Sequence, residues 1–268
     1  PLRLLVSHYA QIKQKGKPMS NKNIRVALLT FTILSVLYGC RWIPTEDTAT
    51  DQTPSITQET PAATPSDLLS QIPEWDGKPS VIINNNLPFF TETEKTTTTS
   101  FETYSELDAL GRCQAAYACI GTDLMPTEER GDIGSIRPTG WHTVKYPGQI
   151  SDRYLYNRCH LIGYQLTGEN ANERNLITGT RYLNIEGMLP WENQVADYIE
   201  TTGNHVLYRV TPIFLDDDLV CRGILLEAWS IEDDGCRFCV YCYNVQPKIS
   251  IDYATGNSWI TAERRDTP

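Results

Sequence analysis

The chain has 268 residues, of which 40% are hydrophobic and 21% are charged, and its formal net charge is −10. This composition is typical of a globular protein and excludes disorder along the whole chain. The net charge also argues against an extended basic surface for nucleic acid. The charge is unevenly distributed, however: residues 1–40 hold six basic and no acidic residues, and residues 111–210 hold nine basic and eleven acidic ones. A local basic site within residues 111–210 is therefore compatible with the sequence.

The N-terminal region has the pattern of an export signal. Residues 1–18 precede the first methionine, Met19, and we interpret them as an upstream segment that is not part of the native protein. The apolar run over residues 26–37 follows a basic stretch and is shorter than the roughly 20 residues of a membrane-spanning helix. Residues 19–39 therefore predict a signal peptide. Its end, Leu-Tyr-Gly-Cys, resembles a bacterial lipoprotein cleavage box, which predicts an exported bacterial protein, either secreted or held at the cell surface by a lipid on Cys40.

A tether and a folded domain follow this signal. Residues 40–75 are rich in Pro, Thr and acidic residues and contain few apolar side chains. Such a composition cannot offset the entropy lost on ordering the chain, so it predicts a flexible tether. Residues 76–268 are then expected to form the folded domain.

The first half of this domain predicts short elements. Strands are expected over residues 81–83, 115–120, 141–146 and 175–179. The three asparagines at 84–86 predict a turn. Ser105 to Asp108 has the pattern of a capping box and predicts a short helix that ends at Gly111.

The second half predicts the longest elements. Residues 181–200 predict a helix that Gly187 and Pro190 divide and that ends at Gly203. Three long strands are expected over residues 205–214, 219–230 and 238–245, with the acidic clusters between them as solvated turns. These elements predict an α+β fold with a largely antiparallel sheet.

His160 is the most informative of the four histidines because of the residue near it. Arg158 lies two positions earlier, so both side chains point to the same side of an extended strand. A guanidinium is unfavourable in a core but binds phosphate through paired hydrogen bonds. A neighbouring positive charge also lowers the pKa of an imidazole and keeps it able to accept a proton. The pair predicts a phosphate site with a general base.

Asn184 is the second candidate, because asparagine has a low helix propensity and yet lies within a predicted helix. One interpretation is an ordinary surface residue. The other is a carboxamide oxygen that binds a hard divalent cation, since Mg²⁺ keeps most of its waters and needs only one or two protein oxygens besides the substrate phosphate. Glu192 lies eight residues further on, which is about two helical turns.

The motif Asn157-Arg158-Cys159-His160, followed by a short strand with Asn175 and a helix with Asn184, resembles the DNA/RNA non-specific endonuclease family of the ββα-metal superfamily. It is most similar to the secreted streptococcal-type and DNA-entry nucleases. The similarity covers about residues 80–260 and includes segments 140–142, 161–168, 178–184 and 243–247. The motif in this family is Asp-Arg-Gly-His, so here Asn157 and Cys159 replace the Asp and the Gly.

This resemblance implies that a ββα-metal finger carries the active site and that the protein hydrolyses DNA, or DNA and RNA, without sequence preference. His160 would be the general base and Asn184 would hold one Mg²⁺ or Mn²⁺ ion. Arg158 would steady the phosphate, Glu192 would orient water and Asn175 would support the site. No protein partner is expected. Weaker candidates for substrate contact are Arg130, Arg137, Arg153, Arg174, Arg181 and the aromatic Trp141.

The cysteines admit other interpretations. Without Cys40 seven cysteines are left, an odd number that implies at least one free or intermolecularly paired thiol, while export would allow a disulfide. Cys239 and Cys242 would face opposite sides of a strand, which argues against a zinc site. Cys159 would face away from His160, which argues against a Cys-His hydrolase.

The alternative function for the whole chain is that of a surface lipoprotein that binds nucleic acid without cutting it. The presence of both His160 and Asn184 favours an enzyme.

Overall fold

The computed structural model describes residues 70, 72–150 and 154–261. The predicted upstream segment and signal peptide, the predicted lipid site at Cys40 and most of the predicted tether lie outside the described residues. No helix within these described ranges is long and apolar enough to cross a membrane.

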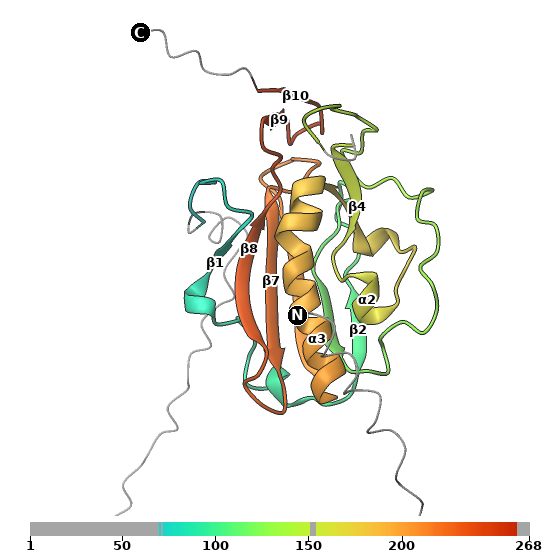
Figure 1. Cartoon of the computed structure of the whole chain (residues 1–268), viewed down its shortest axis with the longest axis vertical. Helices are drawn as coiled ribbons and strands as arrows, with labels where there is room; N and C mark the ends of the chain where they lie inside the picture. Colours follow the sequence, from blue (N-terminus) through green and yellow to red (C-terminus); the bar gives the residue numbers. More distant parts are fainter. Residues whose placement is uncertain (1–69, 71, 151–153, 262–268) are drawn as a thin grey trace, which may run out of the picture. The chain divides into compact units, whose positions relative to one another are not determined.

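A six-stranded antiparallel sheet forms the centre of the fold, with its strands in the order β1-β8-β7-β6-β3-β2 (Figure 1). The bounds are β1 Ser80–Ile82, β2 Phe101–Tyr104, β3 Ala116–Ile120, β6 Val206–Ile213, β7 Gly223–Ser230 and β8 Arg237–Tyr243. The three longest strands, β6 to β8, confirm the three strands predicted in the C-terminal part. The acidic clusters between them form the predicted turns.

Both faces of this sheet are buried along its long strands β6 to β8. Along β6, Tyr208 points to the face that α3 (Leu189–Thr202) covers, and it lies in the same core as Val195 of that helix. Leu207 points to the opposite face and packs there with Phe90. Because neither face of these three strands meets water, they are mostly apolar, whereas strands with one solvated face would alternate.

The ββα unit expected from the resemblance lies against this sheet (Figure 1). Strands β4 (Tyr156–His160) and β5 (Leu176–Thr180) pair antiparallel and are connected through α2 (Tyr164–Thr167). The helix that follows β5 consists of a π-helical turn, Leu183–Met188, and α3. The α+β prediction is thereby confirmed, with a central antiparallel sheet and a ββα finger.

The predicted division of the long helix takes the form of the π turn. The backbone N–H of Leu189 donates to the carbonyl oxygen of Asn184, five residues earlier. Pro190 lies in the first turn of α3 and has no N–H to donate, and in a regular helix its ring would crowd the carbonyl of Glu186. The wider turn accommodates the proline without ending the helix. The helix then ends at Gly203, in the left-handed conformation with φ 74°, as predicted.

The helix predicted over residues 105–111 is wrong. The carboxylate of Asp108 accepts hydrogen bonds from the backbone N–H groups of Leu110 and Arg112, both at 2.9 Å, and the chain turns there at Gly111. Aspartate side chains often bind nearby backbone N–H groups in this way, which stabilises a turn in competition with a helix.

The strand predicted over residues 141–146 is also wrong. This segment is irregular, and only Lys145 forms an isolated bridge, with Tyr154. Its alternating apolar side chains do not reach the central sheet. They pack in a separate cluster against the small hairpin of β9 (Ile249–Ile251) and β10 (Ser258–Ile260).

All seven cysteines in the described part of the chain are free and buried, so no disulfide joins them. Cys239 and Cys242 belong to core clusters on opposite faces of β8, as expected for a strand. Cys159 is fully buried in the main core, while its neighbour His160 lines a pocket. The two side chains of the motif therefore face apart, as predicted.

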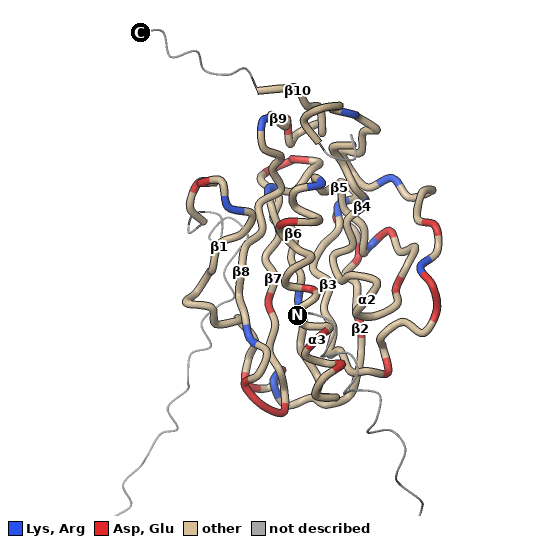
Figure 2. Tube along the Cα trace, viewed as in Figure 1, with Lys and Arg blue, Asp and Glu red and all other residues tan. Residues whose placement is uncertain are grey.

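Acidic and basic residues are interspersed along the chain, including the long segment between β3 and β4 (Figure 2). Several arginines of the described residues are paired with carboxylates. These pairs include Arg112–Asp108, Arg209–Glu227 and Arg222–Asp218, each at 2.7 Å. Whether an arginine can bind an anionic ligand must therefore be judged from the contacts of that arginine.

Gly179 on β5 leaves room for Cys159 on the adjacent strand. A Cβ atom at position 179 would lie well inside the contact distance of Cys159 Sγ and 3.1 Å from its Cβ. Because Cys159 is fully buried, we expect Gly179→Ala to lower the free energy of unfolding by about 1–3 kcal/mol, the usual cost of overpacking. Urea denaturation measures this change.

Cys159→Ala provides the control, because it removes the sulfur that the new methyl group would meet. In the double variant Gly179→Ala/Cys159→Ala, we expect the loss of stability to be smaller than the sum of the two single losses. Strictly additive losses would show that the contact with Sγ is not the cause.

Candidate active site

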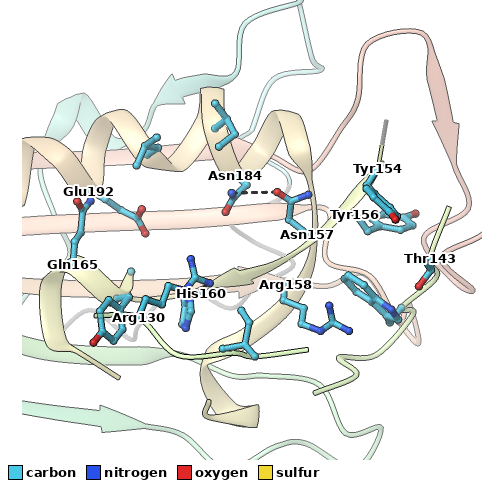
Figure 3. A pocket seen from close by; sticks show the side chains of 16 residues that line it. Arg130, Thr143, Tyr154, Tyr156, Asn157, Arg158, His160, Gln165, Asn184 and Glu192 are labelled. Atoms are coloured by element: carbon cyan, nitrogen blue, oxygen red, sulfur yellow. Dashed lines mark hydrogen bonds between the residues drawn. The ribbon is translucent and has the colours of Figure 1, made fainter. Parts of the chain in front are cut away.

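A pocket of about 780 Å³ lies between β4, the start of the long helix and the segment that connects β3 to β4 (Figure 3). Parts of the chain that are distant in the sequence contribute its polar lining. The residues that carry chemistry are Asn157, Arg158 and His160 from β4, Asn184 and Glu192 from the helix, and Arg130 from the connecting segment.

His160 is the last residue of β4 and is only 6% exposed. Its Nε2 lies 2.8 Å from the backbone oxygen of Asn170. Since a carbonyl oxygen only accepts hydrogen bonds, this geometry assigns the proton of the neutral ring to Nε2. Nδ1 is then the nitrogen that can accept a proton, and it lies 3.4 Å from Nη2 of Arg130.

Burial lowers the pKa of His160, and the positive charge of Arg130 lowers this pKa further, while the hydrogen bond to Asn170 opposes both effects. The net result is a pKa below the ordinary value for histidine. From the sequence we expect the pKa of His160 to be lowered by Arg158. The structure corrects this assignment, because the cation that acts on the imidazole is Arg130.

Arg158 lines the pocket on the side of Trp141 and is held in one orientation. Its Nε donates to the carbonyl oxygen of Ile136 at 2.6 Å and its Nη2 donates to that of Gly134 at 2.9 Å. Its guanidinium carbon lies 4.1 Å from the centre of the Trp141 ring. These contacts fix the guanidinium in advance, which reduces the entropy lost when it binds an anion.

Asn184 projects into the pocket from the π turn (Figure 3). Its Nδ2 donates to Oδ1 of Asn157 at 3.4 Å, which leaves its own Oδ1 as the atom that a cation can bind. Asn157 stands where the related motif has Asp. Both residues offer a side-chain oxygen at this position, so the replacement keeps the acceptor that orients Asn184.

Glu192 lies two turns further along the helix and is 8% exposed. Burial raises its pKa to about 7, although the charge of Arg130 and a hydrogen bond from the backbone N–H of Gly163 both lower this pKa. In a regular α-helix, side chains eight residues apart point about 80° away from each other. The wider π turn alters this angle, and Asn184 and Glu192 both line the pocket (Figure 3).

The side chains that line the pocket suit a hard divalent cation. Asn184, Asn157 and Glu192, which each carry a side-chain oxygen, line it, and no cysteine is among the lining residues. No group of three His, Cys, Asp or Glu that could hold a metal is found among the described residues. Mg²⁺ needs no such group, since it keeps several waters and binds through one or two protein oxygens together with a phosphate. The residues present therefore fit an ion of this kind.

Asn175 lies outside the pocket and is fully buried. Its Oδ1 accepts from the backbone N–H of Ile162 at 2.9 Å, and its Nδ2 donates to the carbonyl oxygen of Ile162 at 3.0 Å. The side chain therefore clamps the chain two residues after His160. These two hydrogen bonds of the Asn175 side chain both go to Ile162, which does not line the pocket.

Three of the weaker candidates are also absent from the pocket lining: Arg137, Arg174 and Arg181. A fourth, Arg153, lies outside the described residues. Arg174 forms an ion pair with Glu106 at 2.9 Å. Arg137 donates to the carbonyl oxygens of Gly134 and Ile136 and borders a second, smaller cavity. Trp141 is the weaker candidate that, together with Arg130, does line the pocket.

Arg130 is the residue that sequence reasoning underrated. It follows two glutamates in an irregular segment, thirty residues before His160, and no spacing or periodicity distinguishes it from other arginines. Only the path of the connecting segment across the end of β4 brings it to the imidazole.

Comparison with known proteins identifies the family of this chain. Residues 92–231 match the model of a family described as DNA/RNA non-specific endonuclease. The structure is similar to that of NucA from Streptococcus agalactiae with magnesium ion bound, with 25% sequence identity and a TM-score of 0.59 over 67% of this chain and 85% of that chain. It is also similar to the Sda1 nuclease with bound zinc ion, with 26% identity and a TM-score of 0.53 over 59% of this chain and 81% of that one. The chain belongs to the DNA/RNA non-specific endonuclease family.

Proposed function

We propose that this nuclease is a metal-dependent, sequence-non-specific endonuclease that hydrolyses phosphodiester bonds of DNA, with RNA as a second substrate. One observation carries the proposal: Nδ1 of His160, the guanidinium of Arg130, the amide of Asn184 and the carboxylate of Glu192 converge on a single pocket. Each of these groups has a role in phosphoryl transfer to water.

His160 is the general base in this proposal. Nδ1 takes a proton from the water that attacks phosphorus, while the carbonyl oxygen of Asn170 holds the ring through Nε2 and stabilises the imidazolium that forms. Arg130 binds a phosphoryl oxygen. A phosphate bound there also offsets the charge that lowers the pKa of His160, so the base becomes stronger once the substrate is in place.

The side chains around Asn184 hold its amide in the orientation in which it would bind a metal ion. A divalent cation, Mg²⁺ or Mn²⁺, held by Asn184 would supply positive charge for the phosphoryl oxygen and the leaving 3′ oxygen. The solved relatives NucA and Sda1 hold magnesium and zinc, respectively. Asn157 orients the Asn184 amide, and the Glu192 carboxylate would orient water in the pocket. Asn175 supports the site by fixing the chain after His160.

The lack of sequence preference follows from the same groups. Arg130 and Arg158 address phosphate, and contacts to phosphate carry no sequence information. The Trp141 ring at the Arg158 side of the pocket would add a stacking contact that tolerates any base. A substrate bound in this way is selected by its backbone.

We also propose that the nuclease is exported and that a lipid on Cys40 holds it at the bacterial surface through the tether of residues 40–75. The basic and apolar pattern before Cys40 supports this proposal. More than one acyl chain would be needed for stable membrane attachment.

The first prediction concerns His160→Ala. Degradation of supercoiled plasmid DNA in the presence of Mg²⁺ should fall by about 10²- to 10⁴-fold, the usual contribution of a general base, and EDTA should abolish the activity of the unaltered protein. Gel electrophoresis over a time course measures both. His142→Ala is the matched control, because His142 is exposed, lies outside the pocket lining and bonds to the Thr255 carbonyl.

Equal activity of His160→Ala and His142→Ala would contradict the assignment of the base. An unaltered protein that retards DNA on a gel without cutting it would instead support the alternative of a surface lipoprotein that only binds nucleic acid.

The second prediction concerns Arg130→Ala. We expect kcat/KM to fall by about 10²- to 10³-fold, as for the loss of one donor to a developing oxyanion. Because Arg130 lowers the pKa of His160, its removal should also shift the acid limb of the pH–rate profile to higher pH. Arg174→Ala, at an arginine outside the pocket, should change neither quantity. A profile of Arg130→Ala that coincides with that of the unaltered protein would exclude the electrostatic role.

The third prediction concerns Glu192 and pH. With a pKa of about 7, about half of this carboxyl group is protonated at pH 7 in the metal-free protein. A nearby cation favours the ionised form, so Mg²⁺ binding should release protons, and its affinity should rise as the pH increases through 7. Calorimetric titration in buffers of different ionisation enthalpy measures the release. Glu192→Gln should abolish it, and an unaltered protein that releases no proton at pH 7 would contradict the prediction.

A further inference from the structure

The turn that leads from β5 into the helix of Asn184 is held by residues 244–246, which follow β8 and lie beyond the family match over residues 92–231. Oε1 of Gln246 accepts a hydrogen bond from the backbone N–H of Tyr182 at 3.2 Å. The backbone N–H of Thr180 donates to Oδ1 of Asn244 at 2.8 Å. A distant segment therefore binds the backbone on both sides of this turn.

Asn244 is fully buried, and its side chain is hydrogen-bonded through both ends. In addition to the contact at Oδ1, its Nδ2 donates to the carbonyl oxygens of Thr178 at 3.1 Å and Cys221 at 2.9 Å. A buried amide is costly unless its groups are satisfied in this way. Asn244 therefore ties β5 to the segment that precedes β7 in the central sheet.

The same segment binds the first turn of the helix. Backbone N–H groups at the start of a helix have no partner within it. Here Tyr182 is bound by Gln246, and the N–H of Leu183 donates to Oγ1 of Thr180 at 2.9 Å. That hydroxyl in turn donates to the carbonyl oxygen of Val245 at 2.6 Å. Both N–H groups directly precede Asn184, so these bonds fix where its Cα lies and in which direction its side chain leaves the helix.

We propose that Asn244 and Gln246 are positioning residues, which hold the Asn184 amide at the pocket and thereby set the affinity for the divalent cation. The proposal rests on the proposed function in one respect, namely that the cation binds at Asn184. Neither Asn244 nor Gln246 lines the pocket, so they act through the backbone of residues 180–183.

Gln246→Ala in the full chain tests this proposal, since Gln246 is less buried than Asn244 and its loss leaves the Asn244 contacts in place. We expect the Mg²⁺ concentration for half-maximal activity to rise by about 10- to 100-fold, the usual effect of losing a partner outside the ligand shell. The KM for DNA and the kcat at saturating Mg²⁺ should stay near those of the unaltered protein. Gln246→Glu keeps an oxygen acceptor for the N–H of Tyr182 and should restore most of the affinity.

Two further measurements do not depend on catalysis. Direct calorimetric titration with Mg²⁺ alone should show the same loss of affinity in Gln246→Ala. Hydrogen exchange should become faster at the amide of Tyr182, which has lost its acceptor, while the amides of β7 keep their protection.

Asn86→Ala is the matched control. The Asn86 amide also clamps backbone from a distant segment, because its Oδ1 accepts from the N–H of Cys239 at 3.1 Å and its Nδ2 donates to the carbonyl oxygen of Arg237 at 3.4 Å. It binds β8 and lies outside the pocket lining. Because Asn86 has a left-handed backbone with φ 64°, which alanine adopts less readily, we expect a loss of thermal stability at least as large as that of Gln246→Ala, without any change in Mg²⁺ affinity.

The possible outcomes separate the two proposals. Unchanged Mg²⁺ affinity in Gln246→Ala, together with faster exchange at Tyr182, would overturn the positioning role and leave the proposed function intact. Equal losses of affinity in Gln246→Ala and Asn86→Ala would also overturn it, because the effect would then be general destabilisation. An unaltered protein that binds Mg²⁺ but does not cut DNA would refute the proposed function, while the comparison of affinities would still decide the positioning role.

Discussion

The hydrogen bond between His160 Nε2 and the carbonyl oxygen of Asn170 is the interaction on which the chemistry of the pocket depends. It places the proton on the nitrogen that faces the protein and leaves Nδ1 toward the pocket. The segment after β4 that leads to Asn170 also contains Ile162, which Asn175 clamps, and Gly163, whose N–H binds Glu192. One stretch of ten residues after His160 therefore orients both the imidazole and the buried carboxylate, and it does so largely through backbone groups.

Burial has opposite consequences for the two titratable groups of this pocket. It lowers the pKa of His160 and raises that of Glu192, because in both cases it favours the neutral form. Arg130 lowers both pKa values, so its charge favours a neutral imidazole and an ionised carboxylate together. These are the states that a general base and a partner of a divalent cation require. A chain with a formal charge of −10 can thus act on a polyanion, because a few oriented cations at one pocket decide the local potential.

Local sequence signals were sufficient for most of the fold. The strands β6 to β8 and the helix that ends at Gly203 follow from periodicity and from turn residues, since their apolar faces are continuous. The signals failed for residues 105–111 and 141–146, which lie in the irregular parts of the domain. In the first, Asp108 binds nearby backbone N–H groups and closes a turn. In the second, an alternating pattern reflects packing against a separate hairpin, which local periodicity cannot distinguish from a place in the central sheet.

For the site, the sequence by itself determined the residue types and their order: Arg158 and His160 on one strand, and Asn184 in the helix that follows. The spacing of residues within a strand shows which side chains lie together, because side chains two residues apart on a strand share a face. Only the tertiary structure decided which groups meet. It placed Arg130 against the imidazole and anchored the turn before Asn184 through residues 244–246, while Arg137 and Arg174 were left outside the pocket. These contacts join segments between thirty and sixty-odd residues apart, and their geometry depends on how the connecting segments cross the sheet, which no local pattern encodes.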